Sequence, residues 1–290
     1  MVYAHCLSRE FKIRRLKQKQ ETNRVVSRLQ KYSTYPPTIF TALHFANTSL
    51  IPLATQSVPD SESYLLLTRE LYQAPGLEHL FLTVPVVTHV VAGLGLRNLR
   101  ASRRARLYGA ETRLQRYKVQ LWPRMSLQAR LGYVLVPLLG AHVLINRVTP
   151  LLVDGDSSAI GLGYIAHGFA RSPLTSNLYY SVFVAAGVWH IVGGWASWMG
   201  WPVTTVRGQW RRRRNHSSLE GHLNEKAWSE QRSQRRNKSK WIVYGVATAG
   251  TVFWLAGSLA IVGRGGPGTA WEAKNWNQIY SQVPLISKWL

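Results

Sequence analysis

Apolar residues in this chain are gathered into five blocks of about 20 residues, separated by polar and charged segments. The blocks cover residues 36–54, 78–96, 131–151, 177–201 and 241–262. A helix of about 20 apolar residues crosses a hydrocarbon core of about 30 Å. Pro85 and Pro137 lie inside the second and third blocks, and membrane helices tolerate proline because neighbouring groups satisfy the freed carbonyls. The pattern therefore predicts an all-α, integral membrane bundle of five transmembrane helices.

Lys and Arg are distributed unevenly over the segments between the blocks. If every block crosses the membrane, residues 1–35, 97–126 and 202–240 lie on one side, here called side A, and contain 29 of the 36 Lys and Arg. Asp and Glu are divided almost evenly, with six on side A and seven on the opposite side, side B. A bias in Lys and Arg alone is the positive-inside pattern. We therefore expect the N-terminus on the cytosolic (or matrix) side and the C-terminus on the opposite side.

This topology predicts three parts: a basic N-terminal arm (1–35), the five-span domain (36–262) and an amphipathic C-terminal tail (263–290). A run of four arginines closely follows the fourth block, and juxtamembrane cations attract anionic lipid headgroups. The members of this run are Arg211, Arg212, Arg213 and Arg214. The topology explains the net charge of +23, so we expect membrane lipids and no nucleic acid as partners. We expect no internal repeat among the blocks.

The composition excludes several classes of protein. A hydrophobic content of 46% excludes a disordered chain, and the single cysteine, Cys6, excludes a disulfide framework or a cysteine-based metal site. The sequence has no phosphate-binding glycine loop, zinc-protease helix signature or nucleophile elbow. These absences favour a non-enzymatic role.

Histidines are the sharpest candidates for chemistry, because each of the first four blocks contains one in its interior. They are His44, His89, His142 and His190. An ionisable side chain at membrane depth is costly and indicates function. His89 and His190 lie about 8 and 10 residues from the side A ends of two parallel helices, and His44 and His142 about 8 and 11. Each pair is therefore expected near one level of the bilayer.

Two imidazoles at one level on facing helices can hold a haem iron as axial ligands. The sequence thus predicts one or two b haems, with the four histidines as iron ligands. Such ligation leaves no open iron position, so the haem would carry electrons or stabilise the fold. The alternative is that these histidines form hydrogen bonds between helices.

The approach to the first block and the block itself, LQKYSTYPPTIFTALHFANTSLIPL from Leu29 to Leu53, resemble the signature of the fungal Mcp family. These are the Mdm-complementing proteins of the mitochondrial outer membrane. The five-block layout and basic loops are similar too. The resemblance implies a mitochondrial membrane, outer rather than inner, and a role in lipid homeostasis. The yeast member recruits a bridge-like lipid-transfer protein through an N-terminal Pro-x-Pro motif, and this chain contains no Pro-x-Pro sequence.

Five spans with a histidine in each of the first four are also similar to the dihaem cytochrome b anchor of some fumarate reductases. The resemblance implies that His44 pairs with His142, and His89 with His190. We therefore expect a membrane protein of lipid homeostasis or organelle contact on a haem b-type bundle, with a bridge-like lipid-transfer protein as its partner. One alternative is an electron-transfer cytochrome b with two bis-histidine haems. Another is a lipid transporter or scramblase.

Overall fold

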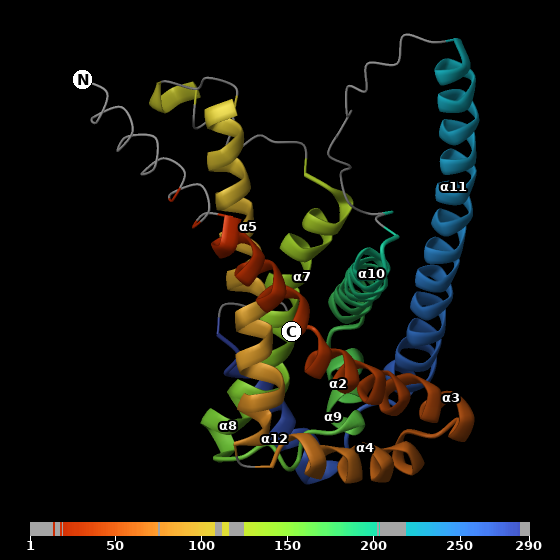
Figure 1. The fold of residues 1–290 in the computed structure, drawn as a ribbon. Coiled ribbons are helices and arrows are strands. Elements are labelled where there is room, and N and C mark those ends of the chain that lie inside the picture. Colours follow the sequence, from red (N-terminus) through yellow and green to blue (C-terminus); the bar gives the residue numbers. More distant parts are fainter. Residues whose placement is uncertain are drawn as a thin grey trace. The chain divides into compact units, whose positions relative to one another are not determined.

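The computed structural model describes most of the chain as helices joined by turns (Figure 1). The described residues are 14, 18, 20–74, 76–107, 112–115, 125–201, 203 and 219–284. No strand occurs among them, which confirms the all-α prediction. Residues 211–214, the predicted headgroup site, lie outside the described residues.

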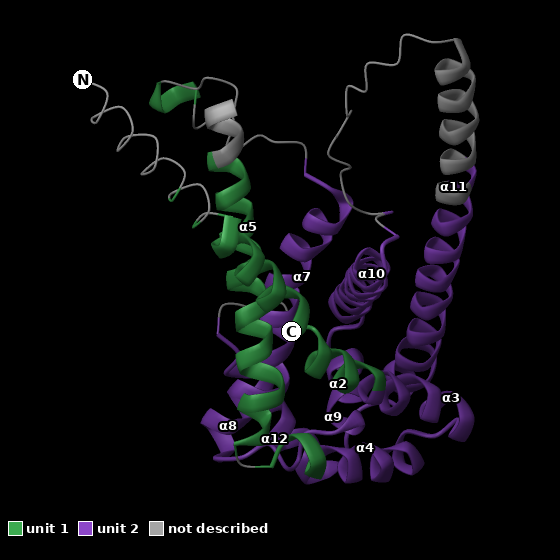
Figure 2. Cartoon of the chain, in the orientation of Figure 1, with its two compact units in different colours: residues 1–42, 70–124 green, residues 43–69, 125–290 purple. Residues whose placement is uncertain are grey.

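The chain forms two compact units (Figure 2). Unit 1 consists of residues 1–42 and 70–124, and unit 2 of residues 43–69 and 125–290. Each unit has its own packing and is described separately below.

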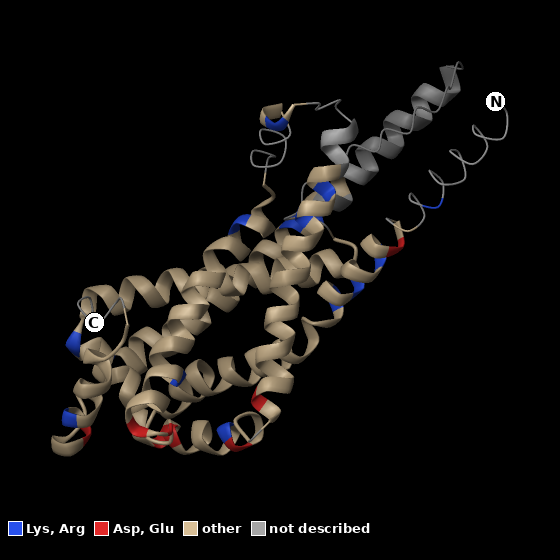
Figure 3. Ribbon diagram, turned by 90° about the vertical axis from the view of Figure 1, so that its left-hand side faces the viewer, with Lys and Arg blue, Asp and Glu red and all other residues tan. Residues whose placement is uncertain are grey.

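Within the described residues, four helical segments are long and apolar enough to cross a membrane. They are His79–Ser102, Leu127–Asp154, Pro173–Trp198 and Asn237–Arg264. They coincide with the second to fifth predicted blocks. Charged residues are sparse in these four segments and lie mostly near their ends, whereas the short helices carry Asp and Glu as well as basic residues (Figure 3). The chain is thus a multi-span helical membrane protein, while the first span stays a prediction.

In unit 1, a helix over residues 20–32 packs on α5 (Val84–Leu107), which follows the π-helical segment η2 (His79–Thr83). The contact is close at Gly93, where an added Cβ would lie 3.0 Å from Nε2 of Gln30. Glycine therefore lets the two helices approach each other.

The centre of unit 2 is formed by three long helices, with α10 (Pro173–Trp198) packed against both α7 (Leu127–Val143) and α11 (Leu219–Leu255). Ser126 caps α7, because its side chain accepts a hydrogen bond from the Ala129 backbone N–H at 3.2 Å. Helix α10 ends at Trp198, and the left-handed backbone of Gly200 (φ 86°) follows.

The first helix is continuous from α2 (Tyr35–Phe45) through the π-helical segment η1 (Ala46–Leu50) to α3 (Ile51–Thr55). Its unit 2 part packs against the end of α11 and the π-helical segment η4 (Ala256–Ile261) that follows. Ser49 Oγ donates a 2.6 Å hydrogen bond to the Phe253 carbonyl there.

A layer of short helices closes the side B end of unit 2. Its helices are α4 (Val58–Tyr72), α8 (Thr149–Asp154), α9 (Leu162–Arg171) and α12 (Ala270–Ser281), with the short 3-10 turn η5 (Val262–Arg264). Residues 270–281 of the predicted tail form α12, which a complete capping box starts at Thr269.

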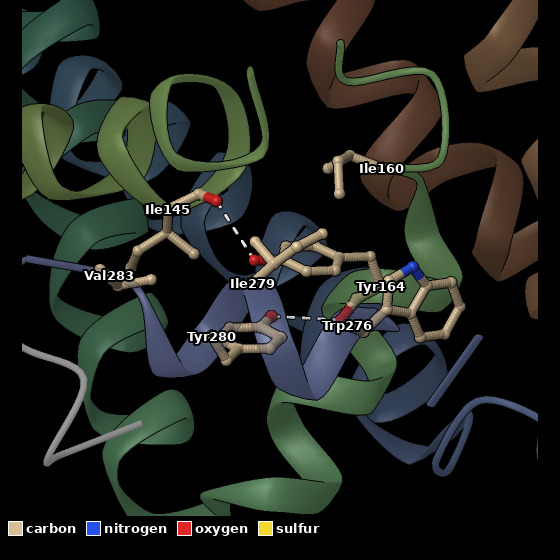
Figure 4. Close-up of a cluster of buried hydrophobic side chains, with 7 residues drawn as sticks. All are labelled: Ile145, Ile160, Tyr164, Trp276, Ile279, Tyr280 and Val283. Atoms are coloured by element: carbon tan, nitrogen blue, oxygen red, sulfur yellow. Dashed lines mark hydrogen bonds between the residues drawn. The ribbon is translucent and has the colours of Figure 1, made fainter. Parts of the chain in front are cut away.

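The core of this layer is aromatic (Figure 4). Tyr164 and Tyr280 stack with ring centroids 4.5 Å apart, and Tyr280 donates a hydrogen bond to the Tyr164 carbonyl at 3.2 Å. Tyr164 donates in turn to the Ile145 carbonyl at 3.2 Å. Burial raises the pKa of both phenols above the ordinary value, so both remain neutral donors. The remaining buried members are Ile160, Trp276, Ile279 and Val283.

Candidate functional site

His44 and His142 come together in unit 2. Their ring centroids lie 6.0 Å apart and the ring planes meet at 76°. Three further rings lie around them: Trp254 is 6.3 Å from His44, Phe183 stacks on His142 at 5.0 Å, and Tyr180 lies edge-on 6.2 Å from His142. The structure thus places two of the four predicted histidines in direct contact, with aromatic side chains around them.

Asn146 lies one turn beyond His142, and its amide nitrogen is 2.9 Å from the His142 carbonyl oxygen and 3.2 Å from Nδ1. The amide oxygen is buried and accepts no hydrogen bond from the described residues. An amide nitrogen only donates, so Nδ1 of His142 accepts here and Nε2 carries the proton. Ligation of a metal through Nε2 would require this proton to leave.

His89 and His190 each place Nδ1 against a backbone carbonyl. His89 Nδ1 is 3.1 Å from the Gln30 oxygen, and His190 Nδ1 is 3.2 Å from the Gln128 oxygen. A carbonyl only accepts, so we assign the proton of His89 to Nδ1 and the lone pair to Nε2. Metal-ligating imidazoles are commonly oriented by such a bond. His190 Nδ1 also lies 3.2 Å from the Gln128 side-chain nitrogen, a donor, so its contacts fit either tautomer. His89 belongs to unit 1 and His190 to unit 2, so their pairing stays a prediction.

The residues around these histidines recur along the chain. Gln30 and Gln128 each precede a block histidine, His44 or His142, by 14 residues. A tyrosine precedes each of these histidines by nine residues, and Pro-Leu begins eight residues after it. The tyrosines are Tyr35 and Tyr133, and the Pro-Leu pairs begin at Pro52 and Pro150. The first and third blocks therefore share one pattern.

The backbone repeats with the sequence. A five-residue π-helical segment begins two residues after each histidine, at η1 and at η3 (Leu144–Val148). Both helices then end at a left-handed residue, Gln56 (φ 54°) or Gly155 (φ 81°). π-Helical segments are rare and often mark functional sites.

The second and fourth blocks match as well. His89 and His190 are each followed four residues later by a glycine, Gly93 or Gly194. A Cβ added to Gly93 would lie 3.0 Å from Gln30 Nε2, and one added to Gly194 would lie 3.3 Å from Gln128 Nε2.

The chain therefore contains a short residue pattern that recurs around its histidines, which the expectation of no internal repeat did not include. Only a few residues are identical between the matching blocks, and each of them lies 4 to 14 positions from its histidine. Aligning the blocks on their histidines is the signal that finds it.

Polar residues of the side B layer were not singled out from the sequence. Arg69 is 9% exposed and donates to the carbonyls of Ser157 and Ile160, both at 2.5 Å. Glu62 accepts a hydrogen bond from the Gly163 backbone N–H at 3.1 Å, at the start of α9. Burial raises the pKa of Glu62, an effect opposed by this bond and by the charge of Arg69.

His167, also missed, is held between two partners. It accepts from the Gly268 N–H through Nδ1 and donates to Asn277 Oδ1 through Nε2, both at 3.2 Å. These bonds account for both ring nitrogens, which indicates a structural role. Arg69, Glu62 and His167 are isolated polar residues in short amphipathic segments, so the sequence alone does not indicate which distant groups they contact.

These features define a class: a multi-span helical membrane protein with half-buried histidines in four of its apolar helices. Residues 137–267 match the family model of the transmembrane domain of MDM10-complementing protein 1. The chain is 27% identical over 217 residues to the mitochondrial adapter protein MCP1 of Saccharomyces cerevisiae. The matched residues make up 67% of this chain and 70% of that relative. No solved structure matches. Both similarities point to the Mcp family, which the residues of the first block also resemble.

Proposed function

We propose that this protein is a five-span adaptor of a mitochondrial membrane, outer rather than inner, that acts in lipid homeostasis or organelle contact. Its similarity to the yeast mitochondrial adapter over 217 residues carries the proposal. The expected partners are anionic lipid headgroups and a bridge-like lipid-transfer protein. The adaptor role needs no catalytic group.

The residue pattern that the first and third blocks share supports five spans. The first helix repeats the pattern of Leu127–Asp154, which is long and apolar enough to cross. The C-terminal end of the first helix lies level with the side B end of the last span, because Gln56 and Ser57 line one pocket with Ile261 and Arg264. A helix of 21 residues, from Tyr35 to Thr55, is about 30 Å long, which is enough to cross the hydrocarbon core. The N-terminus would then lie on side A, together with most of the Lys and Arg.

Expression in yeast cells that lack the matched adapter tests this role. The readout is recruitment of the bridge-like lipid-transfer protein to mitochondria, which in this chain would have to depend on the basic loops because it contains no Pro-x-Pro sequence. We expect recruitment by the native chain and by the H89A/H190A double variant, and loss when Arg211–Arg214 are replaced by Gln. Loss in the histidine variant with retention in the arginine variant would contradict the adaptor role. Lipid movement by the purified protein in liposomes, without a partner, would instead support a transporter or scramblase.

The histidine geometry favours a second candidate, transmembrane electron transfer through bis-histidine haem b. The chemistry of the donor set fits haem. His44 and His142 lie 6.0 Å apart at the ring centroids, and a backbone carbonyl holds His89 with the lone pair on Nε2. When bound, such a haem would accept and release single electrons. The histidines would hold the iron, and the aromatic rings of Trp254 and Phe183 would restrict water.

Absorption spectra of the purified protein, oxidised and dithionite-reduced, with a pyridine haemochrome count, test this candidate. We expect the sharp reduced bands of low-spin b haem. Two haems per chain would support both pairs. With two haems, H142A should remove one while H167A, which changes a histidine outside the pairs, keeps both. A featureless visible spectrum from cells supplied with haem would contradict electron transfer and leave the adaptor role standing.

A further inference from the structure

An apolar groove of about 290 Å³ runs between α10 and α11 in unit 2. Its floor includes Ala196 and Val243, which are buried, while Met199 and Val246 at its edges are exposed. The other residues that line it are Ile191, Val192, Trp195, Trp201 and Ile242. None of these side chains is charged, so the groove suits an alkyl chain.

The groove lies where the apolar part of both helices ends toward side A. Helix α10 ends at Trp198, and the apolar run of α11 begins at Trp241 after Lys240. Tryptophans at such a boundary, including Trp195 and Trp201 in the groove itself, are typical of the membrane–water interface. A lipid chain in the groove would therefore enter from the side A leaflet.

A basic side chain continues the wall of the groove toward water. Lys238 precedes Ile242 by four residues and Val246 by eight, so all three share one face of α11. Four residues of helix correspond to about 6 Å of rise. Lys238 is exposed. Its spacing from Ile242 places it about one turn above the groove, at the level where a phospholipid carries its phosphate.

We propose that this groove binds one acyl chain of an acidic glycerophospholipid, whose headgroup phosphate pairs with Lys238. The inference deepens the proposed role in lipid homeostasis and rests on it. Apolar contact alone cannot select this lipid, because other lipid tails are equally apolar. Selection must come from the cation above the groove, so the site should discriminate by headgroup charge and not by chain.

Native mass spectrometry of the full-length protein from mild detergent tests the site, with phosphatidylserine and phosphatidylcholine of identical chains as probes. We expect one retained lipid per chain and about fivefold more phosphatidylserine, the preference that one lysine near an anionic headgroup supplies. K238Q should remove the preference but keep a lipid. V246W should fill the groove and abolish retention.

The matched control is V252W. Val252 lies on the same helix and is 59% exposed, against 55% for Val246, but it is not part of the groove. V252W should retain the lipid as the native chain does, and equal melting temperatures of the two variants would exclude misfolding as the cause of loss.

Three outcomes would overturn the inference: equal retention of both lipids by the native chain, unchanged retention by V246W, or a lipid-free dimer that V246W dissociates. The last would make the groove an interface between copies. Recruitment of the partner in cells is a separate readout, so failure of the lipid site and failure of the adaptor role are distinguishable.

Discussion

Gly257 lets the first helix touch the last span backbone to backbone. An added Cβ there would overlap the backbone of Ser49, whose side chain bonds the neighbouring turn at Phe253. We expect Gly257→Ala to destabilise the protein by about 1–3 kcal/mol, because backbone cannot yield as a flexible side chain can. The measurement is the melting temperature in detergent. Gly245→Ala is the control on α11, since nothing lies within 4 Å of its added Cβ, and it should cause no loss.

The stability of the folded protein depends on pH through the titration of Glu62. Its pKa in the folded protein is raised above the ordinary 4.5, mainly by burial, so the folded state holds this proton more tightly than the unfolded state. The contribution of Glu62 to stability is therefore full below pH 4.5 and is lost as pH rises through the raised pKa. Glu62→Gln keeps an acceptor for the Gly163 N–H without the titration.

Melting temperatures of the native and Glu62→Gln proteins between pH 4 and 7 check this effect. Relative to the variant, the native protein should lose stability as the pH rises. A difference that stays constant, or that moves in the native protein's favour, would show that the buried carboxylate is fully compensated by the Gly163 N–H and Arg69.

At the residue scale, the sequence identified the four block histidines because an ionisable group in an apolar block is conspicuous. It did not identify Gln30 and Gln128, because their backbone carbonyls hold His89 and His190, and any residue type supplies a carbonyl.

Among the elements, α12 makes the most specific prediction. Trp276 on this helix is buried against Tyr164 and His167, whereas Trp271 is 71% exposed. We expect Trp276→Ala to cost about 3–5 kcal/mol, as large core truncations do, and Trp271→Ala to change stability by less than about 0.5 kcal/mol. Hydrogen exchange of residues 162–171 reports the result. Equal protection in both variants would mean that α12 does not stabilise α9.

The long helices were predictable within a few residues, because about 20 apolar residues in a row have one structural solution in a membrane. The short helices α4, α9 and α12 were not, since each buries only part of its surface. Their packing depends on contacts between distant residues, such as Arg69 with the loop at 157–160. The repeated π-helical segments also escaped prediction, because η1 and η3 have dissimilar sequences.

For the whole molecule, the central claim is that two pairs of helices with a shared histidine pattern and a last helix make five spans, with the N-terminus on side A. The charge bias predicted this topology from the sequence, and the repeat supports it independently. Apolar length alone identifies only four of these segments among the described residues.

Labelling with a membrane-impermeant maleimide tests this claim most directly, because Cys6 is the only native cysteine. In sealed vesicles of one orientation, native Cys6 is compared with Ser239→Cys and Trp271→Cys, both made in a Cys6→Ser background. Five spans predict that Cys6 and the cysteine at position 239 react from the same side, and the cysteine at position 271 from the other. Reaction of Cys6 together with position 271 would show that the first helix does not cross, and would contradict the account.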